Sequence, residues 1–515
     1  MHGLVRVMKA SYLPFLMVYF AYGLTSITGI AVFFWTKDVL KFSATELQLA
    51  AFWAGVPWTL KMLFGQFVDV RPILGSPRRA YIFVGAMCVA CGYLMFAGLA
   101  GGWSPIVALG STLSVYYIAA VAVAIGLVIQ DVTADAMTSE MNTGDERDAR
   151  SIQTLGRIAL AIGALVGAWF ASTLAFIGDN GGRNDSYHVV FLIVCAVPLI
   201  SILGAIMWKQ HSVEREEWSK PILFGGLGFA FFVIAIQFVP TLLQFIIWFL
   251  EVSEMSWIGK TLTILVSIIT VAKAEIVWLG TAIAVGTFLC ILARRLEKEV
   301  VLALVATAAV AFVFRCVPSA GPGVGWWQVD VLGFDRDFLG WLQTIGSVLG
   351  LLGLVLAARS LRNHSVAPVL AFLTVITTVL TLPIVGMYFG LHLWTEEHFG
   401  FGARTIAIID VTLGSPFDQL SMVPILAFIA MVARFGNPAT WFALAASLMN
   451  LALTTSTITT KWLTQLWPVT QAQVQAGVPG DYSNLGVLLI LTTTLGFVLP
   501  LLMIWIFRKQ LNYKI

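Results

Sequence analysis

Residues 33–81 read FFWTKDVLKFSATELQLAAFWAGVPWTLKMLFGQFVDVRPILGSPRRAY. A short polar turn at Lys37–Asp38 separates two apolar segments, and the second segment contains a lysine, Lys61. The stretch ends in an acid, Asp69, followed by three arginines at positions 71, 78 and 79. A charged side chain within a membrane helix is costly, so Lys61 is a candidate functional residue. We expect it to pair with Asp69 or with an acid of the fourth helix.

The composition indicates a membrane protein before any motif is considered. Of the 515 residues, 59% are hydrophobic and 11% are charged, whereas a soluble domain has roughly 25% charged residues. Apolar segments of about 20 residues, the length that crosses the hydrocarbon, recur along the chain. No separate soluble domain fits, and the first segment is too long for a signal peptide. The net charge of +3 lies in short loops beside the spans and does not indicate a nucleic-acid partner.

The apolar segments predict an all-α polytopic membrane protein with fourteen spans in three blocks. An N-terminal half of six spans covers residues 1–221, an inserted pair covers 222–298, and a C-terminal half of six spans covers 299–515. The spans are expected near 11–35, 46–66, 80–100, 105–130, 152–177, 188–208, 222–250, 257–293, 299–318, 338–358, 366–389, 404–432, 438–462 and 484–507. As one straight helix, residues 257–293 would be about 55 Å long, beyond a core of about 30 Å, so this segment must bend, tilt or protrude.

The distribution of lysine and arginine predicts the orientation of the chain. Most of these residues fall in loops and tails on the side of the two termini, so both termini are expected in the cytoplasm, with the protein in a cell inner or plasma membrane. An insertion of two helices keeps both halves in the same orientation. We expect the insert to pack outside a twelve-helix core, and a partner-binding hairpin is the alternative.

Several motifs together resemble one transporter family. The loop between helices 2 and 3 of the major facilitator superfamily is similar to the loop here that carries Gly65, Asp69, Arg71, Gly75, Arg78 and Arg79. The resemblance narrows to the folate-biopterin transporter family through Lys37–Asp38, Pro57–Trp58, Lys61 and the run from Asp69 to Arg79. Residues 314–353 and 422–451 resemble further helices of that family. One departure is Pro438, which stands where the family usually has a glutamate.

This resemblance implies a major facilitator fold that works by alternating access between two six-helix halves. It implies folates or pterins as solutes and protons as the driving ion, with a monomer in a lipid bilayer as the expected state. No catalytic residue, cofactor or metal site is expected, and the chain has no Walker motif for ATP. The alternatives are a permease for another solute, such as muropeptides, and a non-transporting factor for the assembly of membrane complexes.

The fourth span ends in an acidic run, QDVTADAMTSEM. Asp131 and Asp135 are four residues apart and share a helix face, with Glu140 a little over one turn beyond Asp135. Like charges at this spacing repel unless cations or water compensate, and Arg157 is among the arginines that follow. The acids are expected to close a cytoplasmic gate by ion pairing. A direct role in proton or substrate binding is one alternative, and a solvated surface is another.

The predicted gate is a single ionic network that must break in each transport cycle. Its expected members are Lys61, Asp131, Asp135 and either Arg78 or Arg79.

Residues that could bind the solute are expected in the second half. Arg315 lies in a half-helix that ends at Pro318, and its planar guanidinium suits a carboxylate such as the glutamate tail of a folate. The alternative is an arginine that reaches the outer interface. Trp326 and Trp327 could stack on a pterin ring or belong to the aromatic belt of the membrane interface. Asn450 is expected to make an interhelical hydrogen bond, with ligand binding as the alternative.

Two acids in the 404–432 span are proton-site candidates. Asp410 and Asp418 are eight residues apart and therefore lie on similar helix faces. Buried ion pairing is the alternative for both, and a water-filled outer vestibule is a further alternative for Asp410. The full set of proton-coupling or gate candidates is Lys61, Asp69, Arg78, Arg79, Asp131, Asp135, Glu140, Arg157, Asp410 and Asp418.

Overall fold

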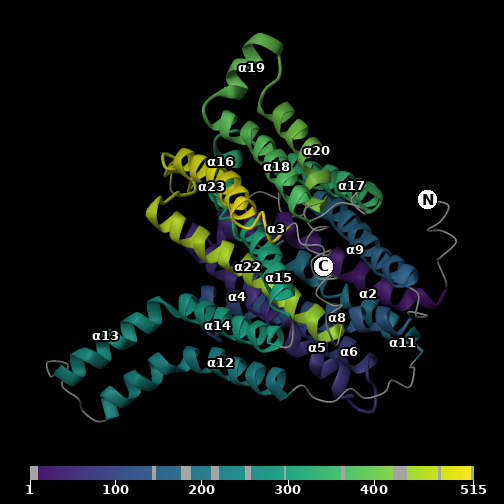
Figure 1. Ribbon diagram of the computed structural model, residues 1–515. Helices are drawn as coiled ribbons and strands as arrows, with labels where there is room; N and C mark the ends of the chain where they lie inside the picture. The colour runs from purple at the N-terminus through teal and green to yellow at the C-terminus, as the bar shows by residue number, and fades with distance from the viewer. Residues whose placement is uncertain are drawn as a thin grey trace.

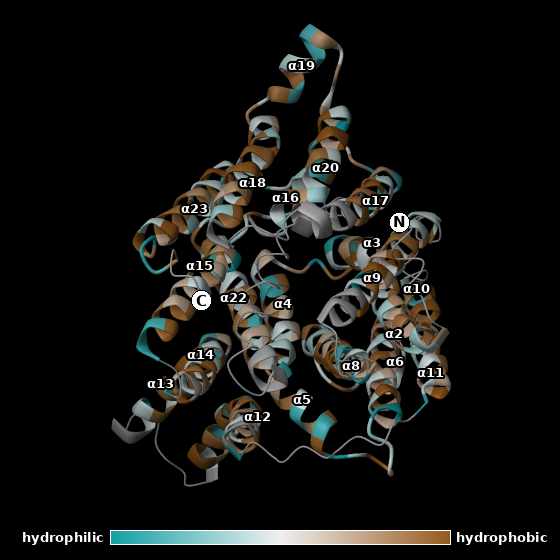
Figure 2. Cartoon of the chain, turned by 45° about the vertical axis from the view of Figure 1, so that its right-hand side comes forward, coloured by the Kyte–Doolittle hydropathy of each residue, from teal (hydrophilic) through white to brown (hydrophobic). Residues whose placement is uncertain are grey.

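The structure, a computed structural model, describes residues 10–141, 146–174, 187–209, 220–249, 257–294, 297–360, 366–420, 438–473 and 477–511. Within these ranges the chain forms a bundle of helices, ten of which are long and apolar enough to cross a membrane (Figure 1). Hydrophilic residues gather mainly at helix ends and loops, while apolar residues run along the helices (Figure 2). These features confirm the predicted all-α polytopic architecture.

The N-terminal half contains a first span, Ala10–Val39, made of several consecutive helical turns. They are Ala10–Tyr12 (η1), Leu13–Leu24 (α2), Thr25–Ile27 (η2), Thr28–Phe34 (α3) and Trp35–Val39 (η3). The other helices of this half are Ala44–Thr59 (α4), Lys61–Val70 (α5), Arg79–Ala100 (α6), Ser104–Val107 (α7), Thr112–Glu140 (α8), Glu146–Leu174 (α9), Tyr187–Val194 (α10) and Pro198–Met207 (α11).

Local signals explain where the second and fourth spans begin and break. A capping box starts α4, because the Ser43 hydroxyl accepts from the Glu46 backbone N–H while the Glu46 side chain bonds back to Ser43. The second span breaks at Leu60, so Lys61 is the first residue of a new helix. The predicted start of the fourth span at 105 is wrong: the chain makes the short helix α7, and Ser111 then caps α8 by accepting from the Ser114 N–H at 3.2 Å.

The N-terminal half is held together by close helix contacts. A Cβ atom added to Gly23 of α2 would lie 2.0 Å from the carbonyl oxygen of Leu160 on α9, and one added to Gly163 would lie 2.1 Å from that of Phe20. The two backbones therefore touch, which only glycine permits at these positions.

The insert consists of Lys220–Phe249 (α12), Trp257–Val271 (α13) and Lys273–Ala293 (α14). The helix is interrupted at Ala272, which confirms that residues 257–293 do not form one straight rod. In Figure 1 the insert lies on one side of the bundle, and α13 reaches furthest from it. The inner part of the insert packs on α4, α5 and α22.

The helices that follow the insert form the C-terminal half. Its helices are Lys298–Cys316 (α15), Gly323–Asp330 (α16), Arg336–Ser360 (α17), Val366–Tyr388 (α18), Leu391–Phe399 (α19), Ala403–Leu420 (α20), Pro438–Leu466 (α22) and Leu485–Ile506 (α23). Pro438 is the first residue of α22, a position where proline is well tolerated because the N–H that it lacks would have no helical partner. The last part of the predicted 404–432 span lies outside the described residues.

The two halves meet along two seams. One seam is formed by α4 and α22, and the other by α9 and α17. The solute path of a two-half transporter runs between such seams. Side chains that face from one half toward the other are therefore candidates for the functional site.

Candidate functional site

Lys61 is the centre of a buried ionic cluster in the N-terminal half. Its Nζ atom lies 2.6 Å from Asp131 Oδ2 and 2.7 Å from Asp135 Oδ2. The side chains of Lys61 and Asp131 are only 9% and 3% exposed, and the hydroxyl of Tyr19 donates to Asp135 Oδ1 at 2.5 Å. These contacts confirm the prediction that Lys61 pairs with acids of the fourth helix. We call Lys61, Asp131, Asp135 and Arg157 the Lys61 cluster.

Arg157 completes the charge balance of this cluster. It projects from α9 and is close enough to Asp131 and Asp135 to interact with both electrostatically. The cluster therefore contains two acids and two cations, with a formal charge of zero when all four are ionised. The repulsion expected between two carboxylates four residues apart is thus compensated.

Arg78 belongs to a second, separate network. Its Nη1 atom lies 3.0 Å from Asp69 Oδ1 and its Nε atom 2.6 Å from Glu140 Oε1. Arg79 donates instead to the backbone carbonyl of Trp208. The prediction of one network is therefore wrong, because Glu140 lies nine residues beyond Asp131 on α8, a rise of about 13 Å.

All described members of the two networks belong to the N-terminal half. They brace α5, α6 and α8 against one another. We call the end of the bundle that carries Asp69, Arg78 and Glu140 the Asp69 end. The opposite end, which carries Lys37, is the Lys37 end.

Arg157 also relates the Lys61 cluster to the second half. Arg315 lies in the last turn of α15, half-buried, and is near enough to Arg157 for the two positive charges to repel each other. The two guanidinium groups come from opposite halves. An anion placed between them would relieve this repulsion.

The other predicted binding residues take structural positions. Asn450 Nδ2 donates to the carbonyl of Trp58 at 2.9 Å, which confirms an interhelical hydrogen bond, here across the α4–α22 seam. Trp326 and Trp327 are 1% and 4% exposed and pack in a core with Tyr482 and Leu485. The interpretation as interfacial belt residues is therefore wrong, because both rings lie inside the protein. A solute could reach them only if this core opened.

Asp410 and Asp418 both belong to α20. Asp410 is half-buried, and the side chain of Asp418 lies outside the described part of the chain.

The Lys37 end holds a set of charges that the sequence did not reveal. Lys37 Nζ of the first span lies 2.7 Å from Asp330 Oδ1 of α16 and 3.2 Å from Asp38 Oδ1. The side chains of Lys37 and Asp330 are 2% and 7% exposed. Arg336 of α17 approaches Asp38 Oδ2 at 3.6 Å. These four residues, the charge quartet, contain one cation and one anion from each half.

Further contacts fix the quartet in place. The second oxygen of Asp330 accepts from the Ala472 N–H at 2.8 Å and from the hydroxyl of Tyr482. Burial, together with the adjacent carboxylate, raises the pKa of Tyr482, which keeps it a neutral donor. Arg336 also lies over the ring of Phe34, 4.7 Å from its centre. The two halves are therefore interlocked at the Lys37 end.

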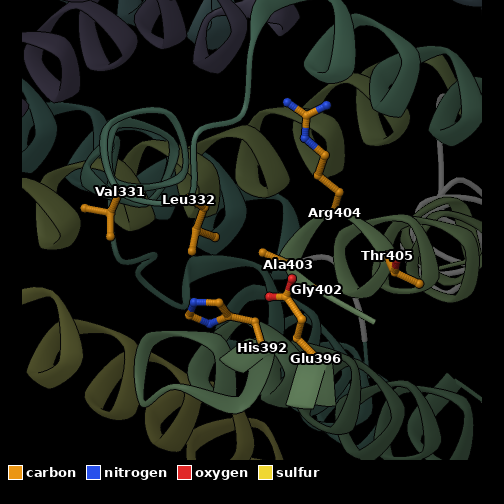
Figure 3. Close-up of a pocket in the computed structure, with 8 residues that line it drawn as sticks. All are labelled: Val331, Leu332, His392, Glu396, Gly402, Ala403, Arg404 and Thr405. Carbon is orange, nitrogen blue, oxygen red and sulfur yellow. The ribbon is translucent and has the colours of Figure 1, made fainter. Parts of the chain in front are cut away.

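A separate cavity of about 360 Å³ lies near this end, between the end of α16, α19 and the start of α20 (Figure 3). His392 and Glu396, one turn apart on α19, both point into it (Figure 3). Arg404 is directed away toward Asp335, 2.6 Å from its Oδ2 atom. The Phe338 backbone N–H and the Arg404 guanidinium hold the pKa of Asp335 below its usual range. This cavity lies in the C-terminal half alone, so it does not join the two halves.

Comparison with known proteins identifies the family. The profile of the BT1 family matches residues 22–514, almost the whole chain. The chain belongs to the BT1 family. A folate-biopterin transporter of Synechocystis is 25% identical to it over 494 residues, which cover 95% of this chain and 80% of that protein. Folate transporter 2 of Plasmodium falciparum is 21% identical over 453 residues, covering 87% of this chain and 79% of that one.

Solved structures identify the fold of this BT1 family member. A POT family transporter in complex with 5-aminolevulinic acid superposes with a TM-score of 0.66 at 12% identity, covering 99% of this chain and 97% of that one. A D-xylose–proton symporter superposes with a TM-score of 0.54 at 13% identity, covering 95% and 96%. The fold is therefore that of the major facilitator superfamily. The family, the relatives and the fold together make the chain a multi-pass membrane transporter, not an enzyme.

Proposed function

We propose that this BT1 family member carries folates or related pterin-like organic anions by alternating access, coupled to protons. The observation that carries the proposal is that Arg157 and Arg315, which come from opposite halves, lie within electrostatic range of each other, and that Arg157 lies beside the buried Lys61 cluster. Guanidinium groups bind carboxylates bidentately. A carboxylate held between these two arginines would contact both halves at once, as a solute must when it drives their relative movement.

The charge balance of the Lys61 cluster supports proton coupling. With Asp131 and Asp135 ionised the four residues sum to zero, and a proton on either acid makes the sum +1. The extra positive charge lies beside Arg157 and so favours binding of an anion near it. By linkage, the anion must favour binding of the proton to the same degree. The cluster can therefore couple proton binding to solute binding without direct contact between the solute and the proton.

Orientation follows from the distribution of positive charge. We infer that the Asp69 end and both termini face the cytoplasm of a cell inner or plasma membrane, and that one chain is the working unit. In this orientation the charge quartet closes the outer side.

Uptake into vesicles tests the proposed function. Purified protein is reconstituted, and uptake of labelled folate, a labelled pterin and a peptide-like control is measured with and without an imposed pH gradient. We expect folate or pterin uptake to rise several-fold with the gradient and the control to remain at background. Transport of the peptide-like solute alone would contradict the substrate class, and folate uptake that ignores the gradient would contradict proton coupling.

Arg315→Lys is expected to weaken solute binding while leaving membrane insertion intact. Lysine keeps the charge but loses the bidentate fork, a loss of roughly 1 to 3 kcal/mol, or about fivefold to over a hundredfold in affinity. Binding to purified protein and uptake at subsaturating solute measure the effect. Arg294→Lys, at an exposed position after α14, is the matched control. Equal affinity of Arg315→Gln and wild type would remove Arg315 from the solute site.

A further inference from the structure

The insert lies over the seam where α4 and α22 meet. Phe229 of α12 and Val277 of α14 share one apolar cluster with Phe52 of α4 and Ile458 of α22. A second cluster joins Phe288 of α14 to residues of α5 and α22. The insert therefore touches both halves, and alternating access requires those halves to move relative to each other. The insert therefore cannot keep its contacts with both halves during this movement.

The contacts with the C-terminal half are polar and directional. Lys461 of α22 forms an ion pair with Glu275 of α14, with side chains 6% and 23% exposed. Glu275 also accepts from Trp462 Nε1 at 3.0 Å. Two helical turns away on α22, Thr455 Oγ1 accepts from Trp278 Nε1 at 2.9 Å. Separating these groups would leave the buried ammonium of Lys461 and the half-buried carboxylate of Glu275 without each other, which is unfavourable in a membrane protein.

The contacts with the N-terminal half are apolar. Between described residues, every hydrogen bond and ion pair that joins the insert to either half goes to α22. On the other side, Gly226 of α12 packs against Leu63 of α5. Within a membrane, lipid chains are as apolar as the side chains that they replace, so such a contact can slide or open at little cost.

The lengths of the connecting segments also favour attachment of the insert to the C-terminal half. Only residues 294–297 lie between the end of α14 and the start of α15, whereas residues 208–219 separate α11 from α12. By length alone, the short connection holds the insert closer to the C-terminal half than the longer one holds it to the N-terminal half.

We propose that the insert is fastened to the C-terminal half and moves with it, so that its apolar face slides over α4 and α5 and covers the α4–α22 seam from lipid. The proposal rests on alternating access, but not on the identity of the solute. Glu275 and Lys461 are then positioning residues: they assign the insert to one half and take no part in binding the solute.

Two covalent bridges test the proposal in a variant whose five native cysteines are replaced by serine. Leu63→Cys with Gly226→Cys joins the insert to the N-terminal half. A Cβ atom on Gly226 would lie 3.2 Å from Leu63 Cβ, close to disulfide geometry, and the Leu63→Cys change removes the leucine methyl group that would clash. Thr455→Cys with Trp278→Cys, joined by a short bifunctional thiol reagent, bridges the insert to α22 and leaves the ion pair in place.

Motion and transport are measured separately. Gln471 is 8% exposed between the halves at the Lys37 end, so the labelling rate of Gln471→Cys by a membrane-impermeant maleimide reports opening there without any solute. The 63–226 disulfide is expected to lower both labelling and uptake at least tenfold, with recovery on reduction. The 278–455 bridge should leave both within twofold. The proposal would be overturned if the 63–226 disulfide left labelling and uptake unchanged. It would also be overturned if the 278–455 bridge lowered them as much as the 63–226 disulfide does. If labelling follows the expected pattern while no folate uptake occurs, the proposal stands and the substrate assignment fails.

A distance measurement covers the case in which a bridged variant does not fold. Gly286 of α14 has open space around it, and Leu453 of α22 and Met87 of α6 are exposed. The distance between spin labels at 286 and 453 should be the same in the otherwise wild-type protein and in the Asp330→Asn variant, whose Lys37 end is expected to be open. Labels at 286 and 87 should change their distance. The reverse pattern would show that the insert moves with the N-terminal half.

Discussion

Replacing Lys61 with methionine is expected to abolish proton-driven uptake and to lower the free energy of unfolding by about 3 to 5 kcal/mol, the range found when one partner of a buried ion pair is removed. Lys61 is the residue that contacts both Asp131 and Asp135, at 2.6 and 2.7 Å. Without it, the buried carboxylate of Asp131 and the half-buried carboxylate of Asp135 keep Arg157 as the cation that balances them among the described residues. Thermal unfolding in detergent and uptake into proteoliposomes measure the two effects.

A double variant separates stability from coupling. Lys61→Met with Asp131→Asn removes one charge of each sign, so the cluster keeps its net charge and much of its shape. We expect most of the lost stability to return while proton-driven uptake stays absent. Lys298→Met, at an exposed position at the start of α15, is the control and should change neither quantity. Wild-type uptake by Lys61→Met at equal protein levels would contradict the role given to the cluster.

The pairing of Lys61 with Asp131 and Asp135 could be predicted because its constraints are local. A lysine within an apolar helix has few stable surroundings, and Asp131 and Asp135 share a face by their spacing alone. Helix length is also a local property, and ten of the fourteen predicted spans appear among the described residues as helices long and apolar enough to cross a membrane. Motif resemblance then indicated which helices of the fold those segments become.

The division into two ionic networks could not be predicted from these patterns. Arg78 and Lys61 both precede the acidic run of α8, and either could meet any of its acids. The choice depends on the positions of the helix ends: Asp69 closes α5 and Glu140 closes α8, so both lie beside the start of α6. Such an arrangement is set by helix packing in three dimensions.

The charge quartet is the clearest case of long-range pairing. Lys37–Asp38 is a visible motif, but Asp330 lies almost 300 residues further along, after the half-helix break that Gly321 makes with a φ of +78°. Tyr482 and Ala472, which bind the other oxygen of Asp330, come from yet another connection. No periodicity relates these positions.

Asp330→Asn is expected to open the Lys37 end. In the closed conformation Lys37 is 2% exposed and pairs with Asp330 at 2.7 Å, so the variant leaves a buried ammonium with Asp38 as its remaining partner. Opening lets water reach Lys37. A conformational shift of at least tenfold, about 1.4 kcal/mol, is expected, because breaking a buried pair generally costs more than this. The labelling rate of Gln471→Cys measures the shift, and uptake should fall as the closed state becomes rare.

The pairing itself is tested by the double variant Lys37→Met with Asp330→Asn. Asparagine retains an oxygen that can accept from Ala472 and Tyr482, and methionine removes the ammonium that needs a counter-charge. If the ion pair holds the gate, the double variant should be closer to wild type than either single variant, since no buried charge is left alone. Lys41→Met removes an exposed lysine from the same loop and should have no effect. Additive effects of the two single variants would mean that Lys37 and Asp330 act independently, and that the halves are held together at this end by packing, such as that around Trp326 and Trp327, instead of by charge.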